Sequence, residues 1–591
     1  MTGICVFSFK INNKKYNISL KNGEKYNLNG INLQYTENGS IVDLSCVTDN
    51  PLKDPALAVI FDYKPVDSDR ILLNGYQSWT ESNIVSPNYA QKGINPFFRP
   101  ILNRYRLYSY GDYNFYKYSG RKGRFHSYTF TAFTNGSDEW QFLGSLTDEL
   151  QYTCFDYDTV KGHIIIKPET LGLTLAGGRL NFKMLMKTAK FDELSRIYSE
   201  AQEGNRTIGR LTTGWTSWYN YYTDITPQII SDNIQAIVEG GSKPEYFQID
   251  DGYQAAVGDW LETNNKFPGS MKSVVSQIKN AGMKAGLWLA PFVCEKKSSI
   301  FTNKYHWIMK DKRGKPVIAG NSALWSGDFY ALDIYNDEVR SYLKEVFNLV
   351  VEEWGFDLVK LDFLYAIAIE PPVGKTRGSV MRDGVLFLKE VTKGAKILGC
   401  GVPLGSAAGV FDYCRIGPDA ALIWEDKLLK FLNYRERVST AATLRNTVTR
   451  SIIDGIFFGN DPDVFILRNE NNSLSRDQKD TLFIVNLLFC SLVFTSDNIK
   501  NYDERMKQLY KFHLLIKDKQ VRLVDYRENI ATAEVVLNNG PLYIFYINLS
   551  LDKEFSIDDR LRIPAGSTMI FKADVTGTSV DLLSFTELLY I

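Results

Sequence analysis

Histidine is scarce in this sequence: 591 residues contain only four, against ten Trp and 34 Tyr. Zinc hydrolases and metal-dependent sugar isomerases usually need imidazole ligands, so the scarcity disfavours both classes. An all-carboxylate Mg²⁺ site stays open as an alternative. We therefore expect chemistry that needs no metal and no other cofactor.

An excess of charge is lacking as well, because 68 Lys and Arg balance 68 Asp and Glu. A protein that binds duplex nucleic acid needs a basic excess to displace counterions, so we expect no nucleic-acid partner. Hydrophobic residues make up 44% of the chain and aromatic residues 13%. This composition excludes a disordered chain and is sufficient for a large apolar core.

Closely spaced cysteine pairs are absent: seven cysteines lie at positions 5, 46, 154, 294, 400, 414 and 490, with no C-x-x-C. This spacing argues against a disulfide framework or a zinc knuckle and favours a reducing compartment. The first twenty residues lack the pattern of a secretory signal. The longest apolar stretch, 482–494, is too short to cross a bilayer, and we predict a buried helix there. A cytoplasmic protein with no membrane partner is expected.

Three regions of different periodicity predict a multidomain protein of the α/β plus all-β class. Short alternating segments separated by Asn-Gly turns predict an N-terminal antiparallel β-sandwich over 1–190, followed by a linking helix over 191–208. Continuous apolar strands then alternate with helices over 209–497, which indicates a parallel sheet covered on both sides. A (β/α)8 TIM-like barrel fits this length, and a doubly wound sheet is the alternative, although no G-x-G-x-x-G opens a unit. Turn-separated strands return in 498–591 and predict a small C-terminal antiparallel β domain.

Within the predicted barrel, strands are expected at 213–218, 246–250, 285–291, 358–363, 397–401, 413–417 and 456–461. Asn336 is expected to cap a helix with an apolar stripe through Trp354. A second helix, from Met271, should stop at Ala281-Gly282.

Carboxylates follow several of these strands, at the barrel end where active sites lie. They are Asp250, Asp251, Asp362, Asp419, Asp461 and Asp463. Asp is also a common helix cap after a strand, which can explain any one of them. Four such strand endings at one rim favour an active site.

Asp362 and Asp419 have different sequence surroundings. Lys360 lies two residues before Asp362 on the same strand face, so we expect it to lower the Asp pKa and give an ionised nucleophile. A buried ion pair without chemistry is the alternative. Asp419 follows Pro418 and precedes an apolar run, which should raise its pKa as a general acid requires, with Arg415 orienting it. An ordinary loop Asp is the alternative.

Tryptophan accompanies these carboxylates. Trp215 and Trp218 end the first strand, Trp260 follows the second and Trp288 lies in the third. Indole faces bind the apolar face of a sugar ring, although a single Trp is more often part of a core. Two carboxyls with separated pKa values beside such rings are the equipment for cleaving glycosidic bonds.

An ordered set of motifs strongly resembles the α-galactosidases of glycoside hydrolase family 36, particularly the shorter bacterial and archaeal type. The resemblance covers about 209–463 and reaches back to the motif Gly75-Tyr76-Gln77-Ser78-Trp79. The motifs within that range are Gly214-Trp215-Thr216-Ser217-Trp218, Phe247-Gln248-Ile249-Asp250-Asp251-Gly252-Tyr253, Gly258-Asp259-Trp260, Gly286-Leu287-Trp288-Leu289-Ala290-Pro291-Phe292, Lys360-Leu361-Asp362-Phe363, Leu398-Gly399-Cys400-Gly401-Val402-Pro403-Leu404 and Arg415-Ile416-Gly417-Pro418-Asp419.

The resemblance implies a β-sandwich, a catalytic barrel and a C-terminal β domain, and a retaining double displacement through a galactosyl-aspartate. The substrate would be an oligosaccharide with a terminal α-galactose. By the same resemblance, Asp362 is the nucleophile and Asp419 the acid/base. The implied sugar-binding residues are Asp250 and Asp251 for the 4- and 6-hydroxyls, Lys360 for ring hydroxyls, Trp288 and Trp260 in the pocket wall, Cys400 and Arg415 near the 2-position, and Trp79 at the mouth.

Alternatives stay open within and outside this family. The stretch Cys-Gly-Val-Pro-Leu-Gly at 400–405 replaces the Cys-Ser-Ser-Gly-Gly-Gly of larger members, which leaves open an α-N-acetylgalactosaminidase. A galactosyl-transferring enzyme resembling raffinose synthases is the other family alternative. A catalytically inactive carbohydrate-binding barrel is the alternative from another class, and a homo-oligomer is left open.

Overall fold

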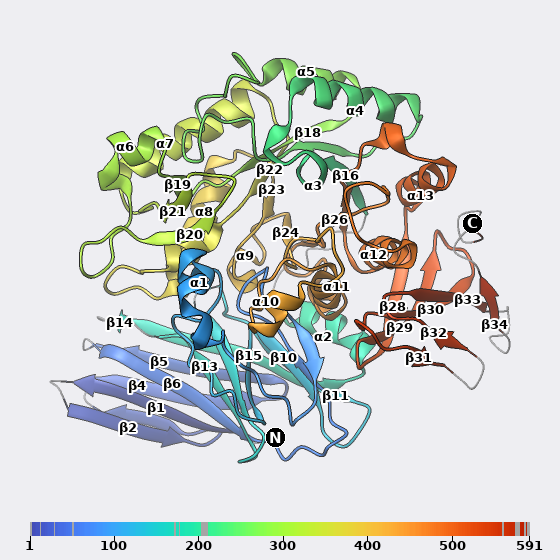
Figure 1. Ribbon diagram of the computed structural model, residues 1–591. Coiled ribbons are helices and arrows are strands. Elements are labelled where there is room, and N and C mark those ends of the chain that lie inside the picture. The colour runs from blue at the N-terminus through green and yellow to red at the C-terminus, as the bar shows by residue number, and fades with distance from the viewer. Residues whose placement is uncertain are drawn as a thin grey trace.

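The computed structural model describes residues 3–11, 14–28, 30–49, 52–149, 151–170, 173–175, 178–202, 211–557, 561–573, 580–583 and 587. Figure 1 shows β-strands of the N-terminal part at the lower left, a central sheet surrounded by helices, and the C-terminal strands at the right. In the described part, no helix is both long enough and apolar enough to span a membrane.

Two antiparallel sheets make up the N-terminal part. One runs in the order β2 (Lys14–Leu20), β1 (Gly3–Ile11), β6 (Leu52–Asp62), β13 (His163–Pro168), β12 (Thr153–Asp158), β9 (Arg124–Tyr128), with β14 (Thr174–Leu175) also beside β6. The other runs β3 (Lys25–Leu28), β4 (Ile31–Asn38), β5 (Ile41–Thr48), β15 (Arg179–Ala189), β11 (Trp140–Ser145), β10 (Phe130–Thr134), β7 (Ile71–Leu73), β8 (Asn83–Val85). Phe7 and Ile164 of the first sheet share one apolar core with Leu44 and Phe182 of the second. This arrangement is consistent with the predicted β-sandwich.

The predicted linking helix begins where the sequence indicated. A 3₁₀ turn, η3 (Phe191–Glu193), leads into α2 (Leu194–Ala201). Residues 203–210, which include the end of the predicted helix and the predicted start of the barrel, lie outside the described residues.

A nine-stranded, entirely parallel sheet forms the centre of the molecule. Its order is β25 (Gly459–Asp461), β24 (Tyr413–Arg415), β23 (Lys396–Gly399), β22 (Leu358–Leu361), β18 (Lys284–Leu289), β17 (Tyr246–Ile249), β16 (Thr212–Thr216), β27 (Leu492–Thr495), β26 (Val464–Phe465). β25 and β26 lie at opposite ends of this order, yet only Pro462 and Asp463 separate them along the chain. The sheet therefore curves until its two ends meet, as in a TIM-like barrel.

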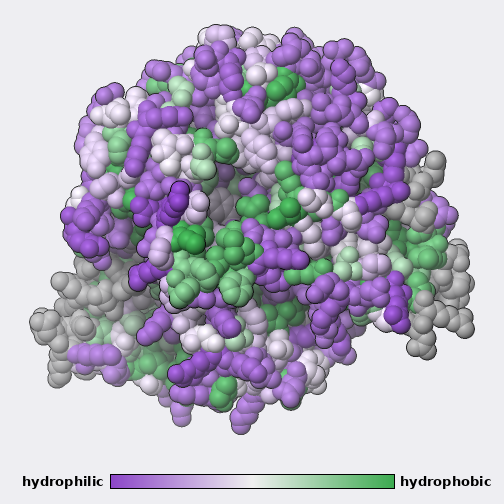
Figure 2. Space-filling view, in the orientation of Figure 1, coloured by the Kyte–Doolittle hydropathy of each residue, from purple (hydrophilic) through white to green (hydrophobic). Residues whose placement is uncertain are grey.

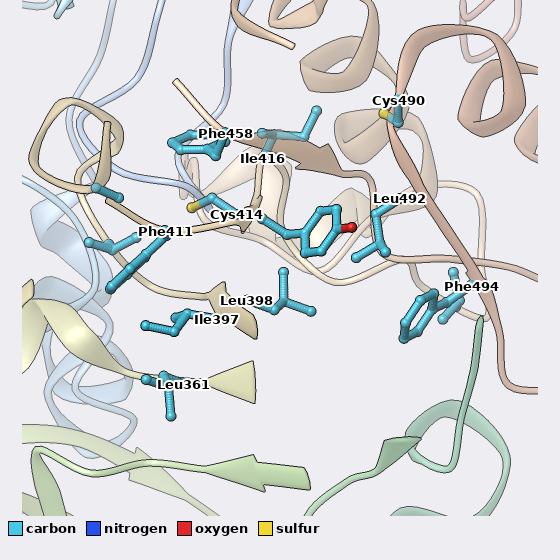
Figure 3. Packing of buried hydrophobic residues seen from close by; sticks show 14 of the residues in the cluster. Leu361, Ile397, Leu398, Phe411, Cys414, Ile416, Phe458, Cys490, Leu492 and Phe494 are labelled. Atoms are coloured by element: carbon cyan, nitrogen blue, oxygen red, sulfur yellow. The ribbon is translucent and has the colours of Figure 1, made fainter. Parts of the chain in front are cut away.

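Helices between these strands cover the sheet: α4 (Pro227–Glu239), α5 (Lys272–Asn280), α7 (Asp337–Phe347), α8 (Arg377–Val391), α11 (Thr440–Thr449) and α12 (Arg476–Phe489). Asn336 caps α7, as predicted, by accepting a hydrogen bond from the Glu338 backbone N at 2.9 Å. α5 ends before Gly282, whose φ of 83° favours glycine. Figure 3 shows Leu361, Leu398 and Leu492, from three different strands, within one buried apolar cluster.

The predicted helix over 482–494 is wrong in its last part. α12 ends at Phe489, Cys490 is extended with φ −132° and ψ 154°, and β27 follows and pairs with β16. A continuous apolar run fits a buried helix and a buried strand equally well, so periodicity alone could not place this change. β27 and the two-residue β26 are the strands of the nine-stranded sheet that were not predicted.

A five-stranded antiparallel sheet ends the chain, in the order β28 (Lys519–Arg527), β29 (Ile530–Leu537), β30 (Leu542–Asn548), β33 (Thr568–Ala573), β34 (Val580–Leu583). The two-stranded sheet of β31 (Phe555–Ser556) and β32 (Arg562–Ile563) lies beside it, and α13 (Glu504–Leu515) precedes it. The antiparallel pairing agrees with the predicted C-terminal domain. The domain boundaries at 190, 208 and 497 stay predictions.

Three segments that the sequence pattern did not predict surround the C-terminal end of the central sheet. The first comprises α1 (Arg99–Arg104) and η2 (Leu107–Ser109) of the N-terminal part. The second is a small sheet of β19 (Val293–Glu295), β20 (Ile318–Ser322) and β21 (Gly327–Ala331), and the third is α10 (Lys427–Phe431). These segments deepen the site at the strand ends into a pocket.

Candidate active site

One cavity of about 510 Å³ lies at the carboxyl ends of the central strands. Five of the predicted site residues with charged side chains line it: Asp250, Asp251, Lys360, Asp362 and Asp419. They follow or belong to β17, β22 and β24, strands whose ends the parallel order brings to one rim. The sequence pattern placed them at strand ends, and the fold brings them together.

Lys360 forms its ion pair with Asp250, across the sheet from its own strand. Lys360 Nζ lies 2.8 Å from Asp250 Oδ2, and both side chains are buried. Burial alone would lower the pKa of Lys360, but the Asp250 carboxylate raises it above its usual value. Gln248 Nε2 donates to the same oxygen at 2.8 Å. The pair is thus held in the pocket floor by a direct contact and by a further hydrogen bond from Gln248.

Asp251 is held by two side-chain donors. Gln254 Nε2 donates to Oδ1 at 2.6 Å and Trp325 Nε1 donates to Oδ2 at 2.8 Å. Burial raises the pKa of Asp251 to about 6, although both hydrogen bonds oppose the shift. Trp325 lines the pocket from the loop between β20 and β21, and no sequence motif pointed to it.

Asp362 accepts two hydrogen bonds from uncharged donors. Trp288 Nε1 donates to Oδ2 at 3.1 Å, and the backbone N of Phe363 donates to Oδ1 at 2.8 Å. The expectation that Lys360 lowers the pKa of Asp362 is only partly right. Burial raises the pKa above the ordinary value, and the opposing effect of Lys360 is smaller because its direct partner is Asp250. Asp419, which lines the same cavity, adds to the rise in the pKa of Asp362.

Asp419 belongs to a group of three carboxylates on one guanidinium. Arg415 Nη1 donates to Asp419 at 2.9 Å, Nε donates to Asp461 at 3.1 Å, and Nη2 lies 2.7 Å from Asp463. The Asp419 side chain is 38% exposed, so the apolar residues after it do not enclose it as the sequence suggested. Arg415 orients it, as predicted from the spacing. Burial raises the pKa of Asp463 to about 7, against the effect of Arg415, and the neighbouring Asp419 and Asp461 add to the rise.

The tryptophans divide between the pocket wall and the core. Trp288 and Trp218 line the pocket. Trp260 is completely buried, and its ring centroid lies 5.7 Å from that of Trp288, so it supports the wall from behind. Trp215 is a core residue whose Nε1 donates to the carbonyl of Asp497 at 2.9 Å.

Trp79 reaches the pocket from the N-terminal part of the chain. Its Nε1 donates to Cys400 Sγ at 3.2 Å, and Cys400 is buried behind it. Gly401 has a φ of 60°, and a Cβ there would lie 2.8 Å from the Trp79 ring. Glycine is therefore required at 401 both by backbone conformation and by space.

The loop that carries Trp79 is fastened to the barrel. Buried Arg450 donates to the carbonyls of Ser78 at 2.6 Å and Thr80 at 3.0 Å.

With this geometry in view, residues 213–379 match the family model described as Melibiase. The matched segment lies within the barrel and runs from β16 to the beginning of α8. The match includes Asp250, Asp251, Lys360 and Asp362, and it ends before Arg415. The predicted resemblance to family 36 α-galactosidases is thereby confirmed.

Curated proteins resemble part of this chain at low identity. The chain is 27% identical over 153 residues to an α-galactosidase of Escherichia coli, covering 25% of this chain and 20% of that protein. It is 26% identical over 159 residues to the bifunctional α-galactosidase/sucrose kinase AgaSK of Mediterraneibacter gnavus, covering 26% of this chain and 16% of that protein. The aligned part of the chain thus spans about a fifth of the length of these relatives.

Solved structures share the fold over most of the chain. TtGalA, an α-galactosidase from Thermus thermophilus in complex with p-nitrophenyl α-D-galactopyranoside, aligns with a TM-score of 0.68 at 23% identity, covering 90% of this chain and 98% of that chain. The family 36 α-galactosidase AgaA from Geobacillus stearothermophilus aligns with a TM-score of 0.59 at 14% identity, covering 94% and 81%. At these identities the likeness concerns the fold.

Proposed function

We propose that this protein is a retaining exo-α-galactosidase that releases terminal α-linked galactose. The observation that carries the proposal is the joint presence of Asp362 and Asp419 in one pocket, with a buried lysine–carboxylate pair and indole rings around them. A pair of carboxyls beside a glycosidic bond is what both steps of retaining hydrolysis require. The Melibiase match and the α-galactosidase relatives support this choice of sugar.

In the first step, an ionised Asp362 oxygen attacks the anomeric carbon and forms a galactosyl ester. The bond from that carbon to the leaving oxygen breaks, and Asp419 transfers its proton to that oxygen. The hydrogen bonds from Trp288 Nε1 and the Phe363 backbone N hold Asp362 in one orientation. They also stabilise the ionised form against the rise in pKa that burial causes.

In the second step, Asp419 takes a proton from water, and the water oxygen attacks the anomeric carbon and displaces Asp362. Galactose is released with its α configuration retained, and both carboxyls return to their starting states. The 38% exposure of the Asp419 side chain suits this role, because the group must meet a leaving group and then a water molecule. Arg415 keeps it in place through both steps.

Sugar recognition is assigned to the polar residues of the pocket floor. Asp250 and Asp251 would accept from galactose hydroxyls, and Lys360 would donate to one while it remains paired with Asp250. Trp288 offers a ring for the apolar face of the sugar. Trp325 takes part by fixing Asp251.

The test is an assay of the purified protein on nitrophenyl α-galactoside and on nitrophenyl α-N-acetylgalactosaminide. Galactoside should be the faster substrate, and nuclear magnetic resonance should detect α-galactose before its β anomer. Asp362→Ala should lower kcat on the order of 10⁴-fold, and azide should partly restore turnover by forming β-galactosyl azide. Asp383→Ala, at a half-exposed carboxylate on α8, is the matched control and should retain activity.

Three results would contradict parts of the proposal. Unchanged turnover in Asp362→Ala refutes the nucleophile, and initial release of β-galactose refutes retention. No hydrolysis of either glycoside favours the inactive binding barrel.

A further inference from the structure

The pocket is lined by charged side chains at its floor and by apolar side chains at its mouth. Asp250, Asp251, Lys360 and Asp362 are only 2–9% exposed, which places the charged groups at the inner end. Five large apolar side chains that also line the pocket are 46–66% exposed. They are Ile101, Tyr105, Leu324, Leu428 and Val438. Figure 2 shows hydrophobic side chains gathered beside a hollow near the middle of this face.

Four of these five side chains, all except Val438, come from segments that are packed together. Leu102 of α1 and Leu432 after α10 are buried in one small apolar cluster. Arg106 forms an ion pair with Asp328 at 2.8 Å, and Tyr110 OH donates to the carbonyl of Asn321 at 3.0 Å, so the α1 segment is also tied to the β20–β21 sheet. The apolar rim is therefore a built wall, formed before any substrate arrives.

Two polar side chains beside this wall are already engaged with the protein. Asn321 Nδ2 donates to Asp328 at 2.9 Å, and Glu436 accepts from Thr80 and Tyr113, each at 2.7 Å. A second sugar at the mouth would lose water from its hydroxyls and find few free partners there. An apolar chain would gain from burial against the same wall.

We propose that the mouth binds an apolar aglycone, so that the preferred substrates are α-galactosides of alkyl or acyl chains, as in galactosyl lipids. This inference rests on the proposed function and narrows its substrates from α-galactosides in general to lipid-like galactosides. The alkyl or acyl chain of the substrate leaves the pocket along Ile101, Leu324 and Leu428, while galactose occupies the charged floor. The occupant of this surface is the substrate's own leaving group.

The experiment compares kcat/KM for methyl, butyl and octyl α-galactosides with that for melibiose. Each methylene buried against the wall raises kcat/KM by up to about fourfold. Octyl galactoside should exceed methyl galactoside by at least about tenfold, and should exceed melibiose. The double variant Ile101→Ser/Leu428→Ser should reduce the octyl-to-methyl ratio by at least about fivefold. Leu386→Ser, a 47% exposed leucine on α8 outside the pocket lining, should keep the full ratio.

An octyl-to-methyl ratio near one, or a preference for melibiose, overturns the inference and leaves the galactosidase assignment intact. No hydrolysis of methyl or nitrophenyl galactoside overturns the proposed function instead. Sedimentation velocity tests whether a second copy of the protein occupies this apolar surface instead. If the double variant dissociates an oligomer while the octyl-to-methyl ratio stays unchanged, the wall is a subunit interface and the inference is refuted.

Discussion

Removal of Lys360 tests how the charges of the pocket floor are arranged. In Lys360→Met, Asp250 loses its partner at 2.8 Å while both positions stay buried, with 7% and 3% of the two side chains exposed. Breaking a buried pair by removing one member costs about 3–5 kcal/mol, because the remaining charge is uncompensated. Asp250 keeps Gln248 Nε2 at 2.8 Å and the Asp251 backbone N at 3.0 Å. We therefore expect a loss near 3 kcal/mol, the lower end of that range.

The pH dependence of this loss has a definite sign. In the wild type, the pKa of Lys360 is raised above its unfolded value, so its contribution is present below about pH 10.5 and disappears as pH rises through the higher folded value. In the variant, burial without the ammonium raises the pKa of Asp250. A carboxyl whose pKa is raised in the folded state makes the folded protein less stable as pH increases above the unfolded-state pKa of about 4. The destabilisation by Lys360→Met should thus be larger at pH 8 than at pH 5.

Urea unfolding followed by circular dichroism measures this loss at both pH values. Lys284→Met is the control, because Lys284 pairs with Glu245 at 2.9 Å but is 54% exposed, and such pairs contribute about 0–1 kcal/mol. Lys360→Met/Asp250→Asn should recover most of the stability and none of the activity. If Lys360→Met is no more destabilising than Lys284→Met, then Lys360 does not compensate a buried charge on Asp250, and the reasoning is refuted.

Two other substitutions test neighbouring parts of the pocket. Gly401→Ala should raise KM and destabilise the protein by about 1–3 kcal/mol, because the backbone there is left-handed and the new Cβ would meet Trp79. Gly409→Ala is the control, because Gly409 has a φ of 70° and open space around it. Equal KM values for the two variants would refute the contact with Trp79. Burial raises the pKa of Asp463 to about 7, so the wild type should lose a few kcal/mol of stability as pH rises from about 4 through 7. Asp463→Asn has no carboxyl to titrate there and should not show this loss. Urea unfolding at pH 5 and pH 8 measures this change, and an unchanged pH dependence would contradict it.

Much of the barrel was predictable because its strands are apolar and end in polar residues. The seven predicted strands correspond to β16, β17, β18, β22, β23, β24 and β25. β27 was missed because an apolar run of 13 residues satisfies helix and strand equally, and only pairing with β16 decides between them. Local sequence carries no information about that distant partner.

The site was predictable where residues follow a strand and unpredictable where they come from inserted segments. Asp362 and Asp419 follow strands, so their positions could be inferred from the alternation of strand and helix. Trp325 lies in a loop whose direction depends on the small β19–β21 sheet. The partner of Lys360 was misjudged for a similar reason: Asp362 is near in sequence, but the parallel sheet brings Asp250 within 2.8 Å.

The charge of the pocket lining indicates which substrates and transition states it favours. The lining contains five acidic side chains, Asp250, Asp251, Asp362, Asp419 and Glu436, and one basic side chain, Lys360. The whole chain has a formal net charge of zero, so this acidic excess is local. An anionic sugar would be repelled by it, whereas a neutral galactoside carries no such penalty. Positive charge that develops on the sugar ring as the glycosidic bond breaks would be stabilised by the same carboxylates, which favours the transition state over the ground state.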